Sequence, residues 1–515
     1  MSDFEEQPAD PDSTTAMPSL KVAPAAPTLT HHAASGFAWM LAQTILSKAA
    51  GMLGQVMMAW FLSPGDYGIV GIAYAVSSFP SLIRDAGLTA ILIQRQQHLK
   101  RWASPAFWMS LALGLLAAII MLLAAPLAAR YYHEPALFGL IAVVAAGSVF
   151  NALSTVPNTI LFIQLRFRLQ SLISLVSAIL IVVLNVFMAW RHYGAYSFVV
   201  PTVLVGAGRT AFVWAAAHYP LSPRMQIRRW RFLIGDSGML LLSGAFGMAI
   251  SQGDYLILGK IRGQDVTGIF FFAFNLSWQT LTLLTVSLGA VLFSTLAKLQ
   301  SDPERLVQAY LRAARALALV GVPACLMQAA LADPAIHLFF KAKWFGAIPI
   351  VQVLSVAMAI RVVGTTWGAL NSAQGRFKLQ LVVNAVFCVI FLSSVAVGAK
   401  LGAGLTVACT EAIFFTITDP FSLYIMLRRD RASAAREVLG IYAAPLFAGS
   451  VSVGIAWIVG LGFPSSKPYL VLRITVVAIL STILYIPLAR LLAPKPWAEL
   501  TALRQRVTGR TKSLL

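Results

Sequence analysis

Fourteen apolar stretches, each about 20 residues long, follow one another along this sequence with short connections between them. About 20 apolar residues of helix are enough to cross the hydrocarbon core of a bilayer. Helices satisfy their own backbone hydrogen bonds there, which open sheets cannot do. The sequence therefore predicts an all-α, polytopic integral membrane protein. We expect its helices to centre near Leu46, Ala75, Leu116, Val149, Ile179, Val205, Phe246, Leu281, Leu319, Val356, Phe387, Phe414, Ile455 and Ile479.

The composition supports a membrane protein without a catalytic domain. Hydrophobic residues make up 58% of the chain and charged residues only 11%, whereas a soluble domain has about 25% charged residues. The connections between the apolar stretches are too short to contain a soluble enzyme domain. The net charge of +20 is scattered over these connections, so it does not form the continuous basic face that binds nucleic acid.

The two ends of the chain differ from the apolar body. Residues 1–35 carry five acidic residues and many Pro, Ala and Thr, a composition typical of a disordered tail. This segment lacks the basic start of a signal peptide. Residues 493–515 are polar and basic, and we expect them to lie against anionic lipid headgroups.

The distribution of basic residues predicts the orientation. The tails and the even-numbered connections hold about three times as many Lys and Arg as the odd-numbered connections. Arg228 and Arg429 belong to the first group, and Lys343 belongs to the second. Basic loops remain in the cytoplasm. We therefore expect both termini of this multi-pass protein to be cytoplasmic.

A short basic segment occurs twice. The sequence QLRFRLQ at 164–170 returns 210 positions later as QGRFKLQ at 374–380. Two weaker matches, Gly68 with Gly268 and Gly194 with Gly404, follow in the same order. Self-similarity of this kind indicates a chain built from two homologous halves, which in a carrier are related by an axis along the membrane normal.

The repeat divides the chain into two pseudo-symmetric lobes of six helices with two extra C-terminal helices. The expected boundaries follow the apolar stretches: a cytoplasmic tail at 1–35, an N-lobe at 36–218, a basic linker at 219–235, a C-lobe at 236–428, two added helices at 437–492 and a basic tail at 493–515.

Charged residues inside apolar stretches are candidate functional residues, because each costs about 2.5–3.5 kcal/mol to insert. Arginine carries a planar donor fork that suits phosphate oxygens. We interpret four basic residues as the lining of a cationic, substrate-binding lumen: Lys48, Arg84, Arg209 and Arg361. Two alternatives stay open: an ion pair or helix cap that Arg84 forms with Asp85, and a structural, snorkelling role for Arg209 and Arg361. Three carboxylates, Asp85, Glu411 and Asp419, are candidates for ion coupling or for ion pairs between the lobes. In particular, the 210-residue offset aligns Arg209 with Asp419, so either these two pair or each meets a partner in its own lobe.

Several segments resemble the polysaccharide-exporting, Wzx-type flippases of the multidrug/oligosaccharidyl-lipid/polysaccharide exporter superfamily. They are Leu62–Ile69 (LSPGDYGI), Asp85–Leu88, Ile91–Arg95, the first basic segment and Gly346–Ile350. The resemblance implies two six-helix lobes arranged in a V around a central cationic cavity. It also implies translocation of undecaprenyl-diphosphate-linked oligosaccharide by alternating access, for lipopolysaccharide, capsule or exopolysaccharide.

The partners expected from the resemblance are the lipid-linked oligosaccharide, anionic membrane lipid, and a polysaccharide polymerase with its chain-length machinery. Two alternatives remain open: a flippase for the peptidoglycan lipid precursor, and a multidrug or cation antiporter of the same superfamily. Basic residues outnumber carboxylates inside the spans, which favours an anionic substrate.

Enzyme chemistry is not expected. The sequence has no Gly-x-x-x-x-Gly-Lys-Ser/Thr loop for ATP. Its seven histidines are dispersed without metal-binding spacing. The three cysteines lie in apolar stretches, where buried thiols are expected rather than disulfides. We therefore predict no enzyme, no catalytic residue, no metal and no cofactor, while proton or sodium coupling remains open.

Overall fold

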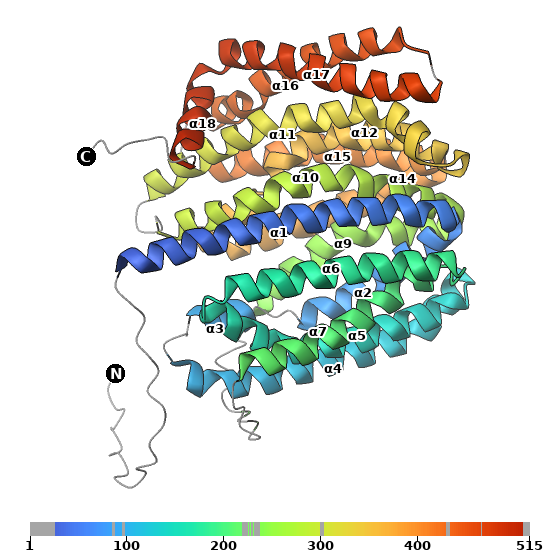
Figure 1. Ribbon diagram of the computed structural model, residues 1–515, viewed down its shortest axis with the longest axis vertical. Helices are drawn as coiled ribbons and strands as arrows, with labels where there is room; N and C mark the ends of the chain where they lie inside the picture. The colour runs from blue at the N-terminus through green and yellow to red at the C-terminus, as the bar shows by residue number, and fades with distance from the viewer. Residues whose placement is uncertain are drawn as a thin grey trace.

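The computed structural model describes residues 26–84, 88–94, 98–218, 225, 227, 230, 237–298, 303–428, 433–464 and 466–507. Fourteen long helices run across the molecule within these ranges (Figure 1). They are α1 (Ala26–Phe61), α2 (Pro64–Arg84), α4 (Leu99–Tyr132), α5 (Ala136–Ile163), α6 (Phe167–Trp190), α7 (Tyr196–Ala217), α9 (Ser237–Arg262), α10 (Gln264–Lys298), α11 (Pro303–Phe339), α12 (Ile348–Gly364), α14 (Phe377–Leu401), α15 (Gly404–Leu427), α16 (Ala434–Leu461) and α17 (Lys467–Leu492).

Each of the fourteen predicted centres falls in a different one of these helices. Ten of the spans are long and apolar enough to cross a membrane by length and composition. The four helices outside that group are α1, α2, α9 and α15, and the last two carry the buried acidic residues Asp254 and Glu411. The all-α, multi-pass prediction is confirmed for the part of the chain that the structure describes.

The two halves pack in the same order. In the N-lobe, α1 packs on α6, α4 on α5, α5 on α7, and α6 on α7. In the C-lobe the corresponding contacts are α9 with α14, α11 with α12, α12 with α15, and α14 with α15. The lobes lie side by side in Figure 1, with α16 and α17 added beyond α11. This is the two-lobe fold that the repeat predicts.

The repeated basic segment has the same geometry in both lobes. Leu165 and Gly375, which are 210 positions apart, both adopt left-handed backbone conformations, with φ of 57° and 66°. The following arginine then begins the next helix in each lobe. Arg166 donates from Nη1 to the Ala216 carbonyl at 3.1 Å, and Arg376 donates to the Met426 carbonyl at 3.3 Å. Each arginine thereby ties the start of one helix to the end of the next.

The lobes meet at the N-terminal ends of α2 and α10 and at a short 3-10 helix, η3 (Ala342–Ala347). Tyr67 of α2 is buried between Phe198 and Trp344, whose rings lie edge-on at 4.8 Å. Trp344 also donates from Nε1 to the Ala59 carbonyl of α1 at 2.8 Å. A buried apolar cluster therefore joins the two lobes at this end.

Helices extend into both segments that the sequence predicts as tails. Helix α1 begins at Ala26, inside the segment 1–35 predicted as a disordered tail; residues 1–25 lie outside the described residues. The Ala-rich segment continues the helix because nothing in it breaks the backbone pattern. The basic C-terminal segment forms a helix, α18 (Pro494–Val507), which packs on α11 and α17.

Three short elements complete the described chain: α3 (Leu88–Gln94), η3 and α13 (Trp367–Ala373). The helix α17 is anchored to the C-lobe through Arg473, which donates to Asp333 of α11 at 3.0 Å. This ion pair attaches the two added helices to the C-lobe rather than to the N-lobe.

Candidate functional site

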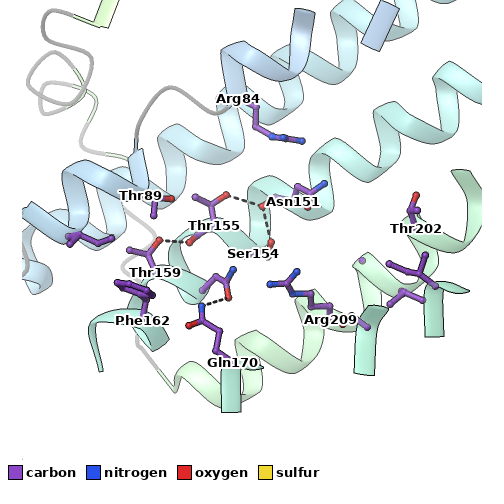
Figure 2. A pocket seen from close by; sticks show the side chains of 16 residues that line it. Arg84, Thr89, Asn151, Ser154, Thr155, Thr159, Phe162, Gln170, Thr202 and Arg209 are labelled. Carbon is purple, nitrogen blue, oxygen red and sulfur yellow. Dashed lines mark hydrogen bonds between the residues drawn. The ribbon is translucent and has the colours of Figure 1, made fainter. Parts of the chain in front are cut away.

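A polar cavity of about 680 Å³ lies inside the N-lobe. Helices α2, α3, α5, α6 and α7 all contribute to its wall. Figure 2 shows its polar side chains directed toward one another from these helices. The residues that line it are Arg84, Thr89, Ile93, Asn151, Ser154, Thr155, Asn158, Thr159, Phe162, Gln170, Ser177, Ile181, Thr202, Val205, Gly206 and Arg209.

Helix α5 supplies most of the polar wall. Successive members of the series Asn151, Ser154, Thr155, Asn158 and Thr159 are three or one residues apart, and alternate members are four apart. Residues three and four apart lie on the same side of an α-helix. The opposite side of α5 is apolar and packs against α4. This stripe gives a membrane-spanning helix a continuous hydrophilic face toward the cavity.

The hydroxyl groups of the stripe are oriented as acceptors. Ser154 and Thr155 both donate to the Asn151 carbonyl at 2.9 Å, and Thr159 donates to the Thr155 carbonyl at 2.8 Å. A hydroxyl that already donates its hydrogen to a backbone carbonyl can still accept hydrogen bonds at its oxygen. The wall therefore accepts hydrogen bonds from a ligand that carries many hydroxyl donors. Gln170 donates to Asn158 at 3.3 Å and extends the amide part of the wall.

Two arginines face this cavity from different helices. Arg84 ends α2 and Arg209 lies in the second half of α7. Figure 2 shows Arg209 extending toward Ser154, with Arg84 beyond Asn151 on the other side. Arg209 forms no ion pair or hydrogen bond with the described residues, and its guanidinium lies at the cavity wall. Two guanidinium groups next to a hydroxyl-accepting wall suit an anionic, hydroxyl-rich ligand.

Lys48 lies elsewhere, on the face of α1 that meets the C-lobe. Its Nζ donates to the Thr282 hydroxyl of α10 at 3.1 Å. Gln55, seven residues further along, hydrogen-bonds to Gln279 of α10. The two side chains share one face, as the spacing predicts, and that face contacts the opposite lobe.

Arg361 occupies the interior of the C-lobe. Its guanidinium lies 3.5 Å from the ring centre of Phe415 and 5.0 Å from that of Trp278. Asp254, Glu411 and Asp419 are the carboxylates whose charges act on it. The carboxylate oxygens of Glu411 accept no hydrogen bond from the residues that the structure describes. The C-lobe interior thus holds three carboxylates and one arginine that stacks on Phe415.

The structure brings together only part of the predicted lumen. Arg84 and Arg209 share the N-lobe cavity, whereas Lys48 lies between the lobes and Arg361 in the C-lobe. Within the described ranges no ion pair joins Arg209 to Asp419. Asp419 instead fits beside Gly364, where a Cβ would lie 2.3 Å from its Cγ. Each residue therefore has its own surroundings in its own lobe. Asp85 lies outside the described residues.

The sequence analysis missed the α5 stripe. A count of charged residues in each span passes over it because Asn, Ser and Thr are neutral. The signal was nevertheless present: polar residues on one face of a span that is otherwise apolar. Across the described ranges, no group of three or more His, Cys, Asp or Glu side chains is placed to hold a metal ion.

The fold is that of known helical transporters. Over 88% of this chain and 98% of the other, it matches the lipid II flippase MurJ in an inward closed conformation, with a TM-score of 0.70 and 13% identity. A multidrug resistance MATE family transporter in an inward-facing conformation matches over 76% of this chain and 96% of its own, with a TM-score of 0.58 and 15% identity. The fold is therefore the one that these two membrane transporters share.

Sequence similarity identifies the family to which the chain belongs. The family model described as polysaccharide biosynthesis protein matches residues 57–349. That match covers more than half of the chain, and the chain belongs to this family. The teichuronic acid biosynthesis protein TuaB of Bacillus subtilis is 22% identical over 76% of this chain and 81% of its own length. The lipopolysaccharide biosynthesis protein WzxC of Escherichia coli is 21% identical over 83% and 87%.

Proposed function

We propose that this protein is a flippase for undecaprenyl-diphosphate-linked oligosaccharide repeat units in the bacterial inner membrane. It works without catalytic residues, by alternating access of one binding site to the two sides of the membrane. The translocated units serve the synthesis of lipopolysaccharide, capsule or exopolysaccharide. Family membership and the names of the relatives, all from polysaccharide biosynthesis, support this class of substrate.

The observation that carries the proposal is the composition of the N-lobe cavity. Its wall combines the guanidinium groups of Arg84 and Arg209 with the hydroxyl and amide groups of α5. A diphosphate brings at least two negative charges, which Arg side chains bind with paired hydrogen bonds. The attached sugars bring hydroxyl donors for the acceptors on α5. Both parts of one amphiphilic ligand therefore have matching groups within a single cavity.

The orientation that we propose places both termini and the two basic segments in the cytoplasm. On this topology the end of α5, the start of α6 and Arg84 all belong to the cytoplasmic half of the membrane. The N-lobe cavity then lies near the side on which a lipid-linked sugar unit would be loaded. A polymerase and its chain-length machinery would receive the unit on the opposite side.

Reconstituted vesicles provide the test. The purified protein is placed in liposomes with a lipid diphosphate that carries a short tritiated oligosaccharide, and an impermeant glycosidase reports the fraction exposed outside. We expect Arg209→Gln and Arg84→Gln to lower the rate of exposure at least tenfold. The matched control is Arg312→Gln, because Arg312 is exposed on α11 and does not line the cavity.

The same vesicles separate the two alternatives. Faster exposure of a peptidoglycan lipid precursor than of the oligosaccharide lipid would replace the proposed substrate. Flux of a hydrophobic cation without movement of either lipid would identify a cation antiporter. Equal rates for the wild-type protein and for empty liposomes would contradict the proposed function altogether.

A further inference from the structure

A second, apolar cavity of about 480 Å³ lies on the outer side of α6 and α7. We call it the α6–α7 groove, and its lining residues are Leu169, Leu172, Ile173, Val176, Ser177, Leu180, Leu184, Leu204, Val205, Gly208, Arg209 and Phe212. Leu180 and Phe212 are exposed over 46% and 55% of their surface. On membrane-spanning helices such exposed apolar residues face lipid, so the groove opens to the hydrocarbon of the bilayer.

The groove and the polar N-lobe cavity meet at the same residues. Ser177, Val205 and Arg209 line both. An apolar face toward lipid is ordinary in a membrane protein, but an apolar groove that ends at an arginine is not, because a charge is costly inside the membrane. From the lipid inward, the path therefore passes the apolar groove, then the guanidinium of Arg209, and then the polar N-lobe cavity.

Helix α7 keeps the junction open. Gly206 lines the polar cavity and Gly208 lines the groove, one on each side of Ala207. A Cβ added at either glycine would meet no atom within 4 Å. Side chains at these positions would project into free space, so the glycines leave room for something other than protein.

We propose that the α6–α7 groove holds the first part of the hydrocarbon chain of the lipid-linked glycan, while Arg209 binds its diphosphate and the polar cavity receives its sugars. The substrate thus enters the N-lobe sideways from the bilayer, between α6 and α7. The inference rests on the proposed function and deepens it, since it assigns each chemical part of the substrate to a part of the lobe. The charge of Arg209 selects an anionic amphiphile, and the size of the polar chamber favours one with a bulky hydrophilic headgroup over an ordinary phospholipid.

Photo-crosslinking tests the occupant. Benzoylphenylalanine in place of Leu180 is compared with benzoylphenylalanine in place of Ile390, which is the position 210 residues later on α14 and is similarly exposed at 48%. In vesicles with the tritiated oligosaccharide lipid, we expect at least fivefold more tritium bound at Leu180. Equal labelling at both positions would overturn the groove assignment. Labelling of phospholipid alone at Leu180 would overturn it as well.

A filled groove provides the second test. Gly208→Leu adds a side chain where a Cβ meets no other atom, so the helix folds, and we expect glycan exposure to slow at least fivefold. The matched control is Gly454→Leu on α16, where a Cβ also meets nothing within 4 Å, and its rate should equal that of the wild type. A wild-type rate for Gly208→Leu would contradict lateral entry. If Gly208→Leu and the wild type both transport the glycan at the same rate, lateral entry is wrong but the proposed flippase function stands. If the wild type does not transport the glycan at all, both proposals are wrong.

Discussion

Gly68 of α2 and Gly268 of α10 bring the backbones of the two lobes into direct contact. A Cβ on Gly68 would lie 1.9 Å from the Gln264 carbonyl oxygen, and a Cβ on Gly268 would lie 1.7 Å from the Pro64 carbonyl oxygen. The two glycines also face each other's backbone nitrogens, at 3.0 and 2.8 Å. They are the pair that the internal repeat aligns, so equivalent positions of the two halves touch at the pseudo-symmetry axis.

Replacing either glycine should push the lobes apart. We expect Gly68→Ala and Gly268→Ala each to lower stability by about 1–3 kcal/mol, because the added carbon overlaps backbone that cannot rotate away. Thermal unfolding in detergent, followed by size-exclusion chromatography, measures the change. Gly51→Ala is the control, since a Cβ there meets no other atom. Unchanged unfolding temperatures for Gly68→Ala would show that the helices separate without cost.

The two basic segments predict opposite responses to exchange. Leu165 holds a left-handed conformation that costs a residue with a side chain about 1–2 kcal/mol, whereas Gly375 holds it freely. Leu165→Gly should therefore raise the unfolding temperature, and Gly375→Leu should lower it. Leu165 is half exposed, so little burial is lost by its removal. Shifts of the same sign in both variants would rule out backbone strain as the cause.

Arg209 and Asp419 should behave independently. Each lies in its own lobe without an ion pair to the other, so the exchange Arg209→Asp with Asp419→Arg should transport no better than Arg209→Asp alone. The glycan-exposure assay measures the three rates at matched protein abundance. Partial recovery in the double variant would mean that the two residues meet in another state of the transport cycle.

Arg361 should be needed for folding of the C-lobe. Arg361→Met keeps an apolar contact with Phe415 but leaves three carboxylates without their nearby cation, and loss of a buried charge partner costs about 3–5 kcal/mol. We expect much less folded protein in the membrane. Adding Glu411→Gln should restore part of the yield by removing one carboxylate charge. Normal abundance of Arg361→Met would instead assign Arg361 to transport.

Cysteine labelling tests the orientation. In a variant with Cys325, Cys388 and Cys409 replaced by Ser, single cysteines are introduced at Lys400, which is exposed in the last turn of α14, and at Arg228. An impermeant maleimide added to intact cells should label Lys400→Cys only. Lys400 serves better than Lys343 because the Lys343 side chain is bonded to the Leu62 carbonyl at 2.5 Å. Outside labelling of Arg228→Cys would contradict the proposed topology.

Most of the fold follows from the sequence because membrane helices are defined by local apolar length. The repeat of 164–170 at 374–380 also predicts which helices of the two lobes correspond. In the structure the arginine of each copy forms the equivalent hydrogen bond. Helix packing across the lobes has no such local signal. The repeat aligns Gly68 with Gly268, but nothing in the sequence predicts that the two glycines touch.

The site was less predictable for a physical reason. A buried charge is easy to find along the chain, but its partners are set by tertiary packing. Lys48, Arg209 and Arg361 look alike in the sequence, yet one bridges the lobes, one faces a cavity and one stacks on Phe415. Apart from Ser177 and Arg209 the groove between α6 and α7 is apolar, so no composition pattern separates it from ordinary lipid-facing surface.

Residues in and next to η3 attach the end of α1 to the C-lobe, and this affects how the two lobes can move. Along its length α1 packs on α6 of the N-lobe, but its last carbonyl groups accept hydrogen bonds from Lys341, Lys343 and Trp344 of the C-lobe. Trp60 answers by donating to the Phe339 carbonyl at 2.6 Å. A rotation that separates the lobes at this end must either break these hydrogen bonds or bend α1. By the internal repeat α1 belongs to the N-lobe, but in a movement of the lobes its end would follow the C-lobe.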